Sequence, residues 1–155
     1  MPLTIDDRQA QEKSRVAGLR LVSLSLRLME YWKHSVDDYD RAMILISVAA
    51  ISGERLLRSM DRPYGALSEV VPPERLAKCN VSSIASATGL NRETTRRKVN
   101  DLVAEGLLAR GDDGSVAFGP GLVQEERTRN LIRSQLGEIA AVANQLIKFG
   151  VFAEE

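Results

Sequence analysis

The sequence has few of the residues on which disulfides, metal sites and stacking surfaces depend. Among its 155 residues there is one cysteine, Cys79, and one histidine, His34. A lone cysteine excludes an internal disulfide, which fits a reducing compartment. Asp37 and Asp38 follow the histidine, but no second histidine or cysteine is near enough to complete a metal site. Aromatic residues make up only 5% of the chain, so stacking on single-stranded bases is not expected.

The chain also lacks the usual signatures of an enzyme and of a membrane protein. There is no Ser/His/Asp set and no phosphate-binding glycine loop, so we predict no catalytic residues, no cofactor and no enzymatic activity. The densest apolar run, Ala42 to Ile51, is too short to span a bilayer. The first residues, MPLTIDDRQAQEK, are too polar and acidic for a signal peptide. We therefore expect a cytoplasmic protein with no membrane partner.

The formal net charge is zero, but the charge is not evenly distributed. Residues 74–110 contain seven Lys or Arg and four Asp or Glu, a net charge of +3, which leaves −3 for the rest of the chain. A hydrophobic content of 44% is sufficient for a packed core. The pattern predicts that one part of a folded domain, and not the whole molecule, meets an acidic partner.

Three long segments have helical periodicity: residues 8–33, 37–59 and 122–148. The first is apolar over more than half of its circumference and must therefore be covered on more than one side. Within it, we expect Tyr31 and Trp32 to be core residues, and they are the candidates to line a pocket for a small-molecule effector. A proline-containing connector over 61–78 follows the second helix, which we expect Asp37 or Asp38 to cap.

The last helix has a coiled-coil-like seam with alternating steps of four and three, formed by Ile132, Leu136, Ile139, Ala143 and Leu146. This seam is too short to hold two chains together alone. Packed with the apolar N-terminal helix, it would form half of a homodimer interface.

Residues 82–110, SSIASATGLNRETTRRKVNDLVAEGLLAR, contain two helices joined by a tight turn. Ser82 or Ser83 can cap the first helix, and Ile84 is its core anchor. Gly89 stands where that helix must end in a left-handed conformation, and Asn91 is suited to cap the second helix. This is the helix-turn-helix layout. The Asp113-Gly114 pair then predicts a hairpin, which in this position would be the wing of a winged helix.

The second helix, which ends at Gly106, is expected to bury one face and expose another. The inward residues are Thr95, Val99, Leu102 and Val103. The outward residues are Glu93, Arg97 and Asn100, with Arg96 and Lys98 flanking them. An outward arginine can pair with guanine and an outward glutamate with the cytosine amino group, while flanking cations and the helix N-terminus hold phosphates. The predicted DNA-binding residues are Ser82, Ser83, Asn91, Arg92, Glu93, Thr94, Arg96, Arg97, Lys98, Asn100 and Arg110.

The segment ATGLNRETTRRKVNDLVAEGLL resembles the helix-turn-helix of the catabolite activator protein (Crp/Fnr) family of bacterial regulators. The resemblance implies that Arg92, Glu93 and Arg97 read base edges. The chain departs from that family in lacking the glycine-rich strands of a cyclic-nucleotide domain. Its helices before and after the winged unit are similar in layout to MarR-type regulators, whose terminal helices form the dimer.

We therefore expect a mainly α fold with a small β-hairpin: a winged helix-turn-helix with long N- and C-terminal dimerisation helices. The expected parts are an N-terminal helix (1–36), the winged domain with its leading helix (37–120) and a C-terminal helix (121–155). The predicted function is a homodimeric transcriptional regulator that binds a palindromic operator in double-stranded DNA. The alternative is a winged-helix module that binds another protein and not DNA.

Overall fold

The computed structural model describes residues 2–59 and 64–154. The predicted mainly helical class is confirmed, and the strands in these residues form two small antiparallel sheets. The chain divides into two compact units. Unit 1 comprises residues 1–32 and 130–155, and unit 2 comprises residues 33–129. The winged domain expected over 37–120 thus lies wholly inside unit 2. No helix in the described part of the chain is long and apolar enough to cross a membrane.

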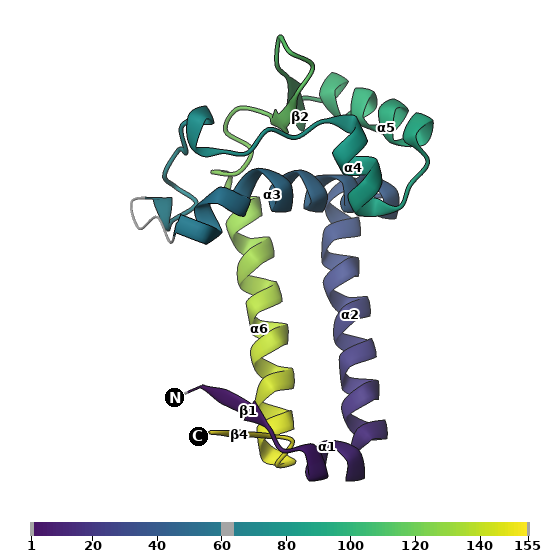
Figure 1. Ribbon diagram of the computed structural model, residues 1–155, viewed down its shortest axis with the longest axis vertical. Helices are drawn as coiled ribbons and strands as arrows, with labels where there is room; N and C mark the ends of the chain where they lie inside the picture. Colours follow the sequence, from purple (N-terminus) through teal and green to yellow (C-terminus); the bar gives the residue numbers. More distant parts are fainter. Residues whose placement is uncertain (1, 60–63, 155) are drawn as a thin grey trace. The chain divides into compact units, whose positions relative to one another are not determined.

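Unit 1 is an antiparallel helix pair closed by a small sheet (Figure 1). Its elements are β1 (Leu3–Ile5), α1 (Asp7–Glu12), most of α2 (Ser14–Val36), most of α6 (Glu126–Lys148) and β4 (Phe152–Glu154). At one end the Lys13 ammonium donates to the carbonyl of Phe149. Further along, the Arg27 guanidinium forms an ion pair with Glu138, with a distance of 2.7 Å from Nε to Oε2. These contacts fix which turns of α2 and α6 face each other.

The buried core of unit 1 is small. It consists of Val142, Leu146 and Val151, against which partly buried side chains from α1, α2 and the C-terminal strand pack. The Tyr31 hydroxyl donates to Glu138 at 3.3 Å, so a polar contact continues the helix interface beyond the apolar cluster. A helix pair with so few buried side chains has little apolar burial to stabilise it.

Two features of unit 1 differ from the sequence prediction. The prediction of one continuous helix over 8–33 is wrong. Helix α1 ends at Glu12, and Lys13 leaves helical geometry with φ −111° before α2 begins. The break holds Lys13 where its ammonium reaches the Phe149 carbonyl, a tertiary contact that overrides local helix propensity. The pairing of β1 with β4, in which Ile5 faces Phe152, was not predicted.

The seam predicted on the C-terminal helix is only partly directed into unit 1. Leu146 is buried against α2, but Leu136 is 60% and Ile139 46% exposed. The side of α6 that meets α2 instead carries Leu146, Val142 and Glu138. This chain therefore covers the seam only in part: Leu136 and Ile139 are exposed, whereas Ile132 and Ala143 are half-buried and Leu146 is buried. The helix itself begins at Glu126, four residues later than predicted.

Unit 2 is built from three helices and a hairpin. Its elements are α3 (Tyr39–Ser59), the 3-10 turn η2 (Pro73–Arg75), α4 (Val81–Thr88), α5 (Arg92–Ala104), β2 (Leu108–Arg110) and β3 (Val116–Phe118). Asp38 caps α3 as predicted, because its side chain accepts from the backbone N–H of Asp40 at 2.7 Å and of Arg41 at 3.2 Å. The connector expected over 61–78 contains η2, and its first three residues lie outside the described residues.

Helices α3, α4 and α5 and both strands of the hairpin contribute fully buried side chains to the core of unit 2. They include Ala42, Ile44 and Val48 of α3, Ile84 of α4, Val99 and Leu102 of α5, and Leu108 and Val116 of the hairpin. The predicted anchor Ile84 and the predicted inward face of α5 are confirmed, with Thr95 buried and Val103 half-buried beside them. Cys79 is buried in unit 2, and burial raises the pKa of its thiol.

The predicted hairpin is confirmed: Leu108 pairs with Phe118 and Arg110 with Val116. Its loop contains Gly114 with φ 79°, a left-handed conformation that glycine adopts without strain. The segment before α4 lies beside the hairpin, since the carbonyl of Cys79 accepts from the N–H of Val116 at 2.7 Å. At the end of β3, a Cβ on Gly119 would lie 2.0 Å from the carbonyl oxygen of Gly106, so only glycine fits there.

Candidate nucleic-acid interface

The first helix of the candidate interface is capped by a residue that the sequence patterns did not single out. Asn80, and not Ser82 or Ser83, is the N-cap of α4. Its side chain accepts from the N–H of Ser83 at 2.9 Å, and the Ser83 hydroxyl accepts from the N–H of Asn80 at 3.0 Å. This reciprocal pair is a capping box, so Ser83 is used within the fold. Ser82 is exposed in the first turn of the helix.

The turn between α4 and α5 follows the prediction. Gly89 has φ 73°, and its N–H donates to the carbonyl of Ala85, which ends α4. Asn91 is the N-cap of α5, because its side chain accepts from the N–H of Glu93 at 2.8 Å and of Thr94 at 3.4 Å. A left-handed glycine and a side-chain cap separated by one residue set a sharp change of direction between the two helices.

Helix α5 has one buried and one exposed face, as the sequence predicts. Thr95, Val99 and Leu102 are buried, and the Thr95 hydroxyl donates to the carbonyl of Asn91 at 2.9 Å, so this buried hydroxyl has a partner. The exposed residues of α5 near its start and middle are Arg92, Glu93, Arg96, Arg97, Asn100 and Asp101. Thr94 is half-buried. The solvent face is therefore polar, with three arginines against two acidic residues.

The charges on this face are not equivalent. Arg96 and Glu93 form an ion pair with 2.6 Å between the guanidinium and the carboxylate. The hydrogen bond from Arg96 is the main reason that the pKa of the Glu93 carboxyl lies below its ordinary value. In contrast, the structure shows no ion pair or hydrogen bond of the Arg92 or Arg97 side chain with any residue that it describes. These two cations are available to an external anion.

Arg110 connects the hairpin to α5. One guanidinium nitrogen donates to Oδ1 of Asn100 at 2.7 Å and another to the carbonyl of Gly114 at 3.3 Å. Arg110 remains exposed, so it lies at the surface between the hairpin loop and the outward face of α5. The contact with Asn100 was not predicted, because hydrogen-bond partners ten residues apart on different elements leave no periodic signal.

The tip of the hairpin is less acidic toward solvent than its sequence indicates. Asp113 forms an ion pair with Lys78 at 2.6 Å and accepts from the hydroxyl of Ser115 at 2.6 Å. The Lys78 ammonium is the largest cause of the lowered pKa of the Asp113 carboxyl. Lys78, which is not among the predicted site residues, thus neutralises one of the two loop aspartates.

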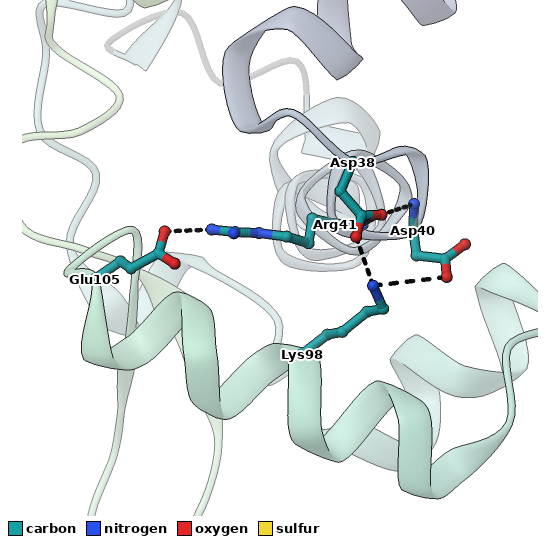
Figure 2. A network of polar contacts seen from close by, with 5 residues as sticks. All are labelled: Asp38, Asp40, Arg41, Lys98 and Glu105. Carbon is teal, nitrogen blue, oxygen red and sulfur yellow. Dashed lines mark hydrogen bonds and ion pairs between the residues drawn. The ribbon is translucent and has the colours of Figure 1, made fainter.

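Lys98 is placed differently from the other predicted DNA-binding residues. Its ammonium lies 2.6 Å from Asp38 and 3.8 Å from Asp40, and its side chain is only 17% exposed. It belongs to the contact between α5 and the start of α3, which Figure 2 shows. Sequence spacing placed Lys98 on the flank of the exposed face, but the carboxylates that hold it come from a separate element.

No metal site accompanies this interface: residues 2–59 and 64–154 contain no group of three or more His, Cys, Asp or Glu side chains that could hold an ion. Comparisons with protein-family models, with curated proteins and with solved structures found no match.

Proposed function

We propose that this protein is a winged helix-turn-helix regulator that binds double-stranded DNA sequence-specifically as a homodimer, with α5 as its recognition helix. The observation that carries the proposal is the division of α5 into a buried face and an outward face, on which the Arg92 and Arg97 side chains form no ion pair or hydrogen bond with a described residue. A helix anchored along one side and basic along the other is what entry into a major groove requires.

The surroundings of α5 support the same function. Helix α4 and the Gly89 turn hold the start of α5, and the β2–β3 hairpin follows it, as in a winged helix. Arg110 extends the basic surface from α5 onto the hairpin. We assign base contacts to Arg92, Glu93 and Arg97, and phosphate contacts to Arg96, Arg110 and the capped N-terminus of α5. Lys98 is not included, because its side chain is only 17% exposed and its ammonium is held by two carboxylates of another element.

The proposed homodimer depends on the apolar side chains that unit 1 leaves uncovered. On α2 they form one stripe at steps of three, three and four: Val16, Leu19, Val22 and Leu26. On α6 the side chains of Leu136, Ile139 and Ile147 are exposed. A helix pair with exposed apolar side chains on both helices can supply half of a four-helix bundle. A second copy of the same helix pair supplies the other half and also gives the two-fold symmetry of a palindromic site.

The experiment that tests DNA binding is selection of random duplexes by the purified protein, followed by affinity measurements over a salt series. We expect a palindromic sequence whose half-sites are about one helical turn apart. On a generic duplex, log K should fall linearly with log salt, with a slope of about −0.9 for each phosphate contacted. Absence of binding at low salt would reject the proposal in favour of a protein-binding winged helix.

Two arginine variants distinguish base contacts made by the recognition helix from the effect of general surface charge on DNA affinity. Arg97→Ala should lower the affinity for the selected duplex by about tenfold or more and relax the preference at one base position. The matched control is Arg55→Ala, because Arg55 is an exposed arginine of α3 in the same unit. If both variants lose affinity equally for selected and generic duplexes, α5 does not read bases.

A further inference from the structure

Ion pairs of both charge orders join α5 to the start of α3: a cation of α5 meets carboxylates of α3, and a carboxylate at the end of α5 meets a cation of α3. Lys98 of α5 meets Asp38, the cap of α3, while Glu105 at the end of α5 meets Arg41 in the first turn of α3. Figure 2 shows the two contacts reaching α5 at separate points, with Asp40 beside Lys98. We refer to Asp38, Arg41, Lys98 and Glu105 as the α3–α5 clamp.

The order of charges in the clamp defines one orientation of α5. Lys98 and Glu105 are seven residues apart, two helical turns, and so lie on the same side of α5. Along that side the charge is first positive and then negative, whereas α3 offers first carboxylates and then a guanidinium. Reversing α5, or sliding it until Lys98 approaches Arg41, would bring like charges together. Apolar burial is non-directional and does not by itself impose this order of charges.

Three of the four clamp groups are shielded enough for their charges to matter. The side chains of Lys98 and Arg41 are 17% and 20% exposed and that of Asp38 is 33% exposed, while Glu105 is 49% exposed. Partly buried pairs are screened less by salt than surface pairs, and removing one partner leaves a charge without its counter-charge. The Lys98 hydrogen bond is the main cause of the lowered pKa of the Asp38 carboxyl, helped by the backbone N–H groups that it caps.

We infer that the α3–α5 clamp positions the recognition helix: its four residues touch no base, but they fix the rotation and axial position with which α5 presents Arg92 and Arg97. This role rests on the proposed DNA-binding function of α5, whereas the clamp as a contact between two helices does not. Sequence discrimination depends on base contacts at fixed geometry, but generic affinity depends mainly on phosphate charge. Disturbing the clamp should therefore affect discrimination more than generic binding.

The Arg41–Glu105 pair allows a charge-swap test that leaves the Asp38 cap intact. Arg41→Glu places two carboxylates opposite each other, and Glu105→Arg places two guanidinium groups opposite each other. The double variant restores opposite charges with the direction reversed and the net charge unchanged. We expect each single variant to lower the melting temperature and the double variant to recover most of that loss. Additive losses in the double variant would overturn the clamp.

The readout of positioning is the ratio of affinities for the selected and the generic duplex. We expect Arg41→Glu to reduce this ratio by about tenfold, comparable to the loss of one base contact. The double swap should restore only part of it, because it re-forms an ion pair but leaves α5 with cations alone and α3 with carboxylates alone, so the alternation that selects one orientation is lost. Arg55→Glu is the matched control, because it makes the same charge change on α3 without facing Glu105; it should weaken both duplexes alike. An unchanged ratio in folded Arg41→Glu protein would overturn the positioning role.

The DNA-binding function and the positioning role of the clamp can be rejected independently of each other. If the wild type binds no duplex at low salt, the DNA-binding function is rejected, and the melting experiment still decides whether the clamp exists. If the wild type discriminates between duplexes but the swap variants discriminate equally well, DNA binding stands and positioning by the clamp is rejected.

Discussion

Unit 2 buries a large apolar core within its own fold, although Leu57 and Val70 stay exposed, whereas unit 1 buries few apolar side chains and leaves many exposed. Unit 2 buries Ile44, Ile84 and Leu102 completely, each from a different helix. Unit 1 buries three side chains in its cluster while Leu19 is 63% and Val22 67% exposed. The contrast indicates that the interior of unit 2 is complete in one chain, and it is the reason that we propose a partner to complete the interior of unit 1.

The polar contacts within the two units show the same contrast between a sparse and a well-packed interior. In unit 1, Arg27 and Tyr31 of α2 both contact Glu138, a polar junction in a helix interface with few buried side chains. In unit 2, two pairs of opposite direction join α3 to α5 over a well-buried apolar core. Charges define geometry most sharply where packing already excludes water. We therefore expect unit 2 to hold its internal geometry more strictly than unit 1.

The largest expected effect comes from the same substitution made in each unit. Leu102→Ala removes a fully buried side chain and should destabilise the protein by about 2–5 kcal/mol at every protein concentration. Leu136→Ala removes a 60% exposed side chain and should change the stability of the monomer by less than about 0.5 kcal/mol. If unit 1 dimerises through this face, Leu136→Ala should instead weaken the dimer about tenfold or more.

Urea unfolding at two protein concentrations, with sedimentation to measure the dimer, separates these effects. A wild type that stays monomeric at high concentration would remove the homodimer from the proposal. A dimer that Leu136→Ala leaves unaffected would place the interface elsewhere.

A glycine substitution in each unit should have effects of opposite sign. Gly119→Ala would force a Cβ to within 2.0 Å of the Gly106 carbonyl, so the hairpin must shift at a cost of about 1–3 kcal/mol. Gly18 lies inside α2, and no other part of the described chain comes within 4 Å of the place that an added Cβ would take. Gly18→Ala should therefore stabilise the helix by about 0.5–1 kcal/mol. Thermal unfolding measures both effects. Destabilisation by Gly18→Ala would show that a partner helix approaches α2 closely there.

The sequence predicted those parts of the site that depend on neighbouring residues. Gly89 ends α4 and Asn91 caps α5 because the left-handed turn and the side-chain cap are local requirements. The buried face of α5 follows from helical spacing alone. The true cap of α4 was missed because Asn80, Ser82 and Ser83 are all suitable caps within four residues, and only the geometry selects Asn80.

What the sequence could not predict depends on contacts between distant segments. Lys98 has the same spacing as a flanking surface residue, and only the position of Asp38 turns it inward. The β1–β4 sheet pairs residues from opposite ends of the chain, and three-residue strands leave too short a pattern to detect. The seam on α6 was recognised as apolar, but which part of it meets α2 depends on the Arg27–Glu138 contact.

The smallest expected effect concerns a helix cap in each unit. Asn80→Ala removes the side-chain acceptor of the capping box and should destabilise unit 2 by about 1 kcal/mol, because α4 carries the buried Ile84. Asp6→Ala removes the acceptor for the N–H of Gln9 at the start of α1, a helix with no buried residues. We therefore expect faster amide exchange confined to α1 and no change in global unfolding. If Asp6→Ala lowers global stability as much as Asn80→Ala does, unit 1 unfolds together with unit 2. The contrast between a complete and an incomplete core would then not describe how this chain is stabilised.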